Sequence, residues 1–152
     1  MEIDELGARA TMDRLPFEVR WPTERGLQLW REGDLATAKS SLEIALTAAR
    51  EIGSEFGIFH ALHLRACVAF SERDYALARD LHNQVLGMCH EIEFLGGMGS
   101  SLCDLAMIDL VEGDVDAAWL RYERGLACYE DGGYVDRAAA ARAMWEQAAQ
   151  AS

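Results

Sequence analysis

Apolar residues recur at steps of three and four positions along most of this chain, the spacing that gathers them on one face of an α-helix. After Asp34 the apolar positions are Leu35, Ala38, Leu42, Ala45, Leu46 and Ala49. The stretches after Asp74 and Asp114 follow the same spacing. These patterns predict a first helix opening at Trp21-Pro22-Thr23, and further helices over about 35–52, 55–72, 75–93, 98–112, 115–130 and 134–149.

The pattern returns at a fixed step of forty residues, which is typical of a repeat array. Each unit has two helices, the first with a small residue at Gly26, Ala66 and Ala106, and the second at Ala38, Ala78 and Ala118. Small side chains let two helix backbones come close, so each unit is predicted to be a helix–turn–helix hairpin. A single hairpin cannot bury apolar faces on both sides. Stacking about three hairpins therefore predicts an all-α solenoid with a C-terminal capping helix.

Turn chemistry supports this division of the chain. An aspartate precedes the second helix of every unit, at Asp34, Asp74 and Asp114. A carboxylate there can accept from the free N–H groups of the first helical turn. Gly53 is suited to the left-handed residue that ends a helix. The three glycines within 94–99 are predicted to weaken the start of the next helix and to let it hinge.

The paired small residues resemble the tetratricopeptide repeat family. The pairs are Gly26 with Ala38, Ala66 with Ala78, and Ala106 with Ala118, followed four residues on by Leu42, His82 and Tyr122. The common form of that family repeats about every 34 residues and closes on Pro. This chain has a step of forty and places Arg50, His90 and Glu130 at the closing position, so it looks like a longer-helix variety.

The resemblance covers about residues 20–150 and implies a right-handed, TPR-like array. Its expected repeats are about 20–53, 54–93 and 94–133, with a cap over 134–150 and a partly ordered leader over 1–19. In that family the first helices of successive hairpins line a concave groove that binds peptides. The groove positions implied here are Arg20, Thr23, Leu27, Trp30, His60, His63, Cys67, Phe70, Ser71, Ser100, Cys103, Met107 and Leu110.

Charge narrows the choice of partner. The chain carries 26 acidic against 14 basic residues, a formal charge of −12, which disfavours nucleic acid and anionic membranes. Some tetratricopeptide domains clamp a partner's acidic C-terminal tail with Lys, Asn and Arg. The corresponding positions here hold Arg20, Thr23, Leu27, Leu64, Ser100 and Asp104. The expected partner is therefore a neutral-to-basic peptide segment with apolar anchors, inserted between Trp30, Phe70 and Met107.

The sequence gives little support for a metal site, a phosphate-binding loop or disulfide bonds. His60, His63, Cys67 and Cys103 offer four nitrogen and sulfur groups, but tetrahedral closure on zinc needs all four to converge, so neither metal nor cofactor is expected. The stretch 96–101 lacks the lysine of a phosphate-binding loop. The four cysteines form no Cys-x-x-Cys pair, and the chain does not begin with a secretory signal, which favours a cytoplasmic protein with reduced thiols.

Three functions follow from these observations. The leading one is a non-catalytic protein-interaction or scaffold module that binds a partner's segment in its groove. The alternative is a ligand-sensing or regulatory array associated with a transcriptional regulator. An enzyme using His60 and His63 is the third, and no substrate is suggested for it. The sequence also leaves a homodimer open.

Overall fold

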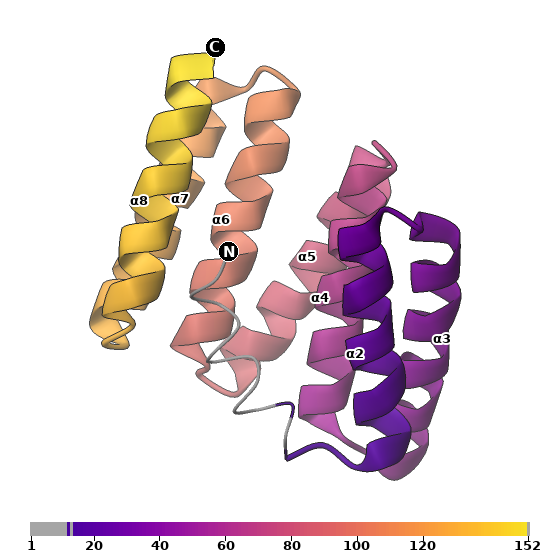
Figure 1. Cartoon of the computed structure of the whole chain (residues 1–152). Coiled ribbons are helices and arrows are strands. Elements are labelled where there is room, and N and C mark those ends of the chain that lie inside the picture. The colour runs from indigo at the N-terminus through magenta and orange to yellow at the C-terminus, as the bar shows by residue number, and fades with distance from the viewer. Residues whose placement is uncertain (1–11, 13, 152) are drawn as a thin grey trace. The chain divides into compact units, whose positions relative to one another are not determined.

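A computed structural model of the chain describes residue 12 and residues 14–151. Helices make up 86% of this part, and it contains no strand. The helices are α2 (Phe17–Glu32), α3 (Leu35–Ile52), α4 (Glu55–Ser71), α5 (Tyr75–Glu91), α6 (Leu95–Val111), α7 (Val115–Asp131) and α8 (Val135–Ala151) (Figure 1). The all-α, helical-repeat fold class predicted from the sequence is confirmed.

The forty-residue step reappears in the helix boundaries. Leu35, Tyr75 and Val115 begin α3, α5 and α7, and Glu55, Leu95 and Val135 begin α4, α6 and α8. The aspartates cap as expected. The backbone N–H groups of Thr37, Leu77 and Ala117 donate to Asp34, Asp74 and Asp114 at 3.2, 3.1 and 3.1 Å. The turns are therefore encoded locally, once in each unit.

A left-handed residue follows every helix from α2 to α7, at intervals of twenty. Glycine takes this conformation at Gly33, Gly53, Gly113 and Gly133, with φ between 69° and 87°. In the middle repeat Arg73 and Glu93 take the left-handed conformation instead, with φ of 63° and 54°. An L-residue with a side chain is strained in this region. The turns of the middle repeat therefore carry backbone strain that the glycine turns of the first and third repeats avoid.

The chain divides into two compact units, and the division falls between Leu81 and His82 inside α5. In the first unit α2, α3 and α4 all contact one another, so the first helices of two successive hairpins lie side by side (Figure 1). Their core is Leu29, Ala38, Leu42, Leu64 and Val68. Gly26 admits the Leu42 side chain, since an added Cβ would lie 2.5 Å from Leu42 Cδ2.

The first helix begins earlier than predicted. α2 starts at Phe17, because the carbonyl of Pro16 accepts from the N–H groups of Val19 and Arg20 at 2.9 and 2.8 Å. Pro22 consequently lies inside the helix, where it leaves the carbonyl of Glu18 without its helical donor. The predicted leader therefore contributes its last three residues, 17–19, to α2.

The described end of the leader packs on the first unit. Met12, Leu15 and Val19 are buried together with Ala49 of α3. The remainder of the predicted leader, residues 1–11 and 13, lies outside the described residues.

In the second unit α7 packs against both α6 and α8. Its core contains Ala106, Tyr122, Tyr129, Ala138 and Ala141. Ala106 and Tyr122 are the small residue and the aromatic residue of the repeat pattern, and they share this core with Ala138 and Ala141 of the capping helix α8.

The glycines before the fifth predicted helix serve packing rather than a break. α6 starts at Leu95 and includes Gly96, Gly97 and Gly99, all of them buried. A Cβ on Gly96 would lie 2.8 Å from the Tyr134 ring, and one on Gly99 would lie 2.7 Å from the Tyr129 ring. The helix therefore starts earlier than the predicted residue 98, and the absent side chains of the glycines make room for two tyrosines.

Candidate functional site

The first unit brings several predicted groove residues onto one face formed by α2 and α4. The indole N–H of Trp30 on α2 donates to the Ser71 hydroxyl oxygen on α4 at 2.9 Å. Trp30 and Leu27 are half-buried against the core formed by α2, α3 and α4. The Trp30 ring is thus held by packing on one side and by a hydrogen bond at its edge. Part of its surface stays exposed.

Phe70 belongs to the same region because it precedes Ser71 at the end of α4. Its ring is half-buried and meets the Tyr75 ring edge-on, with 5.4 Å between ring centroids. Arg20 is half-buried about three turns before Trp30 on α2. The face therefore combines aromatic surface with a few polar groups, as expected for a surface that recognises a peptide.

Other predicted groove residues are in the interior. Thr23 is fully buried, and its hydroxyl donates to the Val19 carbonyl at 2.6 Å. His60 and Ser100 are 7% and 9% exposed. These three side chains have almost no exposed surface to offer a peptide. An error of one residue in the predicted helix register turns a side chain by about 100° around the helix axis, which is enough to move it from the surface to the interior.

The histidine and cysteine candidates of α4 are close together. His63 Nε2 lies 4.0 Å from Cys67 Sγ, one helical turn away, and Phe59 stacks on the His63 ring at 6.0 Å. The distance is a contact between thiol and imidazole rather than a short hydrogen bond. Phe59 also meets the His60 ring edge-on, so aromatic packing accompanies both histidines.

On α6 the predicted groove residues Cys103, Met107 and Leu110 are half-buried. Cys103 packs against the core of the second unit, and its sulfur would lie 2.8 Å from a Cβ built on Gly125 of α7. Its thiol is therefore directed into the hairpin between α6 and α7. The Cys103 side chain is therefore shared between this packing contact and partly exposed surface.

A buried ion pair joins α6 to α7. Asp109 is 3% exposed, and its two carboxylate oxygens accept from Arg121 Nη1 at 2.7 and 2.6 Å. The hairpin brings Arg121, twelve residues later, opposite Asp109 and neutralises it. His82 is buried, with Nδ1 3.8 Å from Asp104 Oδ2.

Sequence reasoning missed an aromatic cluster on α7 and α8. Tyr122 and Trp145 stack at 4.6 Å with 13° between their planes, and Trp119 contacts both rings. Trp119 is 46% exposed. The signal in the sequence was the three-residue spacing of Trp119 and Tyr122, but the ring of Trp145 could be placed only by the packing of α8.

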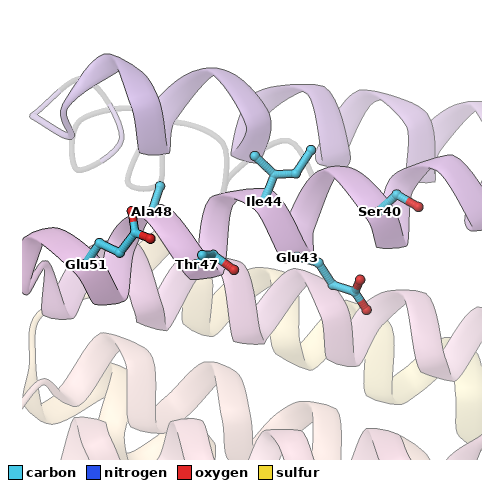
Figure 2. A pocket seen from close by; sticks show the side chains of 6 residues that line it. All are labelled: Ser40, Glu43, Ile44, Thr47, Ala48 and Glu51. Carbon is cyan, nitrogen blue, oxygen red and sulfur yellow. The ribbon is translucent and has the colours of Figure 1, made fainter.

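A shallow depression of about 500 Å³ runs along α3 (Figure 2). The described residues that line it all lie on this one helix: Ser40, Glu43, Ile44, Thr47, Ala48 and Glu51. Glu43 lies 3.8 Å from Arg65 Nη2 of α4, and Ala48 packs against the buried cluster that contains Met12, Leu15 and Val19. Ile44 and the carboxylates of Glu43 and Glu51 are among the residues that line the depression.

Comparison of the chain with protein-family models, with curated proteins and with solved structures finds no match. Within the described range, no helix is both long enough and apolar enough to cross a bilayer. What the chain does must therefore be argued from its own surfaces.

Proposed function

We propose that this protein is a non-catalytic interaction module that binds a neutral-to-basic peptide segment of another protein. The binding surface is the α2/α4 face, made by Leu27, Trp30, Phe70 and Ser71. This reading takes the chain as a relative of the tetratricopeptide repeat class, on the repeat residues given above. Apolar anchors of the partner would cover the exposed part of the Trp30 ring.

The observation that carries the proposal is the hydrogen bond from Trp30 to Ser71. It satisfies the one donor of the indole and fixes the ring in a single orientation while part of it faces outward. A rigid aromatic side chain loses little conformational entropy on binding, which is why such residues dominate binding energy at interfaces. The charge of −12 favours approach of a basic segment over an acidic one.

The test is a titration of the ¹⁵N-labelled full chain, followed through the indole N–H signals of its four tryptophans. Three synthetic helical peptides share the same leucine positions and carry lysine, glutamine or glutamate elsewhere. We expect the lysine and glutamine peptides to shift the Trp30 signal and the glutamate peptide to leave it unchanged. Trp30→Ala should weaken binding by about tenfold or more.

Trp21 supplies the matched control. It lies nine residues before Trp30 in α2, half a turn around the helix, and is 55% exposed. Trp21→Ala should leave peptide affinity unchanged, and thermal melting would verify that both variants fold. Equal losses in the two variants, or tight binding of the glutamate peptide, would show that this face is not the peptide site.

A further inference from the structure

The aromatic cluster of α7 and α8 offers a second surface with its own chemistry. Tyr122, 7% exposed, and Trp145 form the stacked base, and Trp119 lies over their edge with nearly half of its surface outside. The base is rigid because two rings in stacked contact restrict each other. The outer part of Trp119 is therefore a supported platform rather than a loose side chain.

Carboxylates surround this platform. Asp116 precedes Trp119 by three residues and Glu123 follows it by four, so both lie beside it on the surface of α7. All three side chains are exposed. On α8, Glu146 follows Trp145 and is close enough to Tyr122 to act on its phenol. Burial raises the pKa of Tyr122, Arg142 lowers it, and Glu146 raises it again.

Two nearby guanidinium groups already have partners. Arg142 pairs with Glu130 across α7 and α8, and Arg121 pairs with the buried Asp109. The surface presents an exposed aromatic ring with the exposed carboxylates of Asp116 and Glu123 on the same helix.

We propose that the surface formed by Trp119, Trp145, Asp116, Glu123 and Glu146 is a second docking site, which takes an arginine-bearing segment of a partner protein. A guanidinium group would stack on the exposed Trp119 ring and meet a flanking carboxylate at its edge. Arginine suits this site better than lysine, because its planar cation stacks on an indole and donates in two directions.

Charge selects this occupant over the alternatives. A second copy of the chain would bring the same −12, and nucleic acid would bring its phosphates, so each would be repelled before contact. A basic protein segment is attracted by the same carboxylates. The site lies on α7 and α8 and uses no residue of the α2/α4 face, so the two surfaces can succeed or fail separately.

The experiment uses the full ¹⁵N-labelled chain and three helical peptides with common leucines and with arginine, lysine or citrulline at the other positions. Citrulline keeps the shape of arginine without its charge. We expect the arginine peptide to shift the indole signals of Trp119 and Trp145, the lysine peptide to shift them less, and the citrulline peptide to leave them unchanged. Trp30 reports the α2/α4 face in the same spectra.

Two variants make the assignment specific. Trp119→Ala should weaken binding at this site about tenfold, whereas Leu120→Ala, which removes an equally exposed side chain of the next residue, should not. Glu123→Gln combined with Glu146→Gln keeps every ring in place, and it should weaken arginine-peptide binding and reduce its dependence on salt. This pair tests the idea even if Trp119→Ala unfolds the second unit.

Three results would overturn the proposal. One is equal binding of the arginine and citrulline peptides, because the site would then read apolar surface alone. Another is an equal loss of affinity in Leu120→Ala. The third is self-association in sedimentation that Trp119→Ala abolishes, which would assign the surface to a second copy of the chain.

Discussion

Replacing Gly26 by alanine tests the close approach of α2 and α3 on which the first unit depends. The new Cβ would lie 2.5 Å from Leu42 Cδ2 and 2.6 Å from Leu42 Cγ. Leu42 is 0% exposed, so its side chain has no solvent space into which it could turn. Overpacking of this kind costs about 1–3 kcal/mol, and the better helix propensity of alanine returns about 1 kcal/mol.

The contact to Cγ can be relieved only by rotating the whole side chain about χ1, and Leu42 has no exposed surface, so the overpacking cost should lie toward the upper end. We therefore expect a net loss of about 1–2 kcal/mol in the free energy of unfolding. For a chain of this length that corresponds to a fall of about 2–8 °C in melting temperature. Thermal and urea unfolding followed by far-ultraviolet circular dichroism would measure it.

Two further variants separate steric overlap from helix propensity. Gly87→Ala makes the same substitution inside α5, where an added Cβ meets nothing within 4 Å, and it should stabilise by about 0.5–1 kcal/mol. Leu42→Ala alone should cost about 2–5 kcal/mol. In the double variant the methyl group added at position 26 fills part of the vacated space, so the two losses should not add.

A stabilising Gly26→Ala would refute the reasoning, because propensity would then outweigh the contact. Strict additivity of Gly26→Ala and Leu42→Ala would refute it equally, since the two side chains would then not meet.

Three other substitutions address the turns, the ion pair and the buried thiol. Arg73→Gly should raise the free energy of unfolding by about 1 kcal/mol, because glycine adopts the left-handed conformation without strain. Urea unfolding would measure this change, and a lower free energy of unfolding would contradict the prediction. Arg121→Met leaves the Asp109 carboxylate buried without its cation and should cost about 3–5 kcal/mol, whereas a change under about 1 kcal/mol would mean that water replaces the pair. Burial raises the pKa of the Cys89 thiol from 9.0 to about 11. The unfolded chain therefore ionises first as pH rises, and the free energy of unfolding should fall between about pH 9 and about pH 11. Cys89→Ala should lack that part of the pH dependence, and identical pH profiles for the two proteins would contradict it.

The sequence alone determined the elements and their repetition. Asp34, Asp74 and Asp114 cap their helices as expected because an N-cap depends on residues within one turn. The apolar spacing after Asp34 predicted the bounds of α3 because an amphipathic stripe is a local property. The burial of Ala38 was equally predictable, since a small residue that recurs at each repeat marks a helix contact.

Only the tertiary structure decided which side chains meet and which remain outside. The glycines of α6 looked like a hinge until Tyr129 and Tyr134 were found against them. Cys103 was assigned to the groove, but its thiol packs against Gly125 of the following helix. The stacking of Tyr122 on Trp145 depends on how α8 lies on α7. Helical spacing fixes the angular order of side chains around one axis, but the rotation of that helix against its neighbours is fixed by packing, which periodicity does not specify.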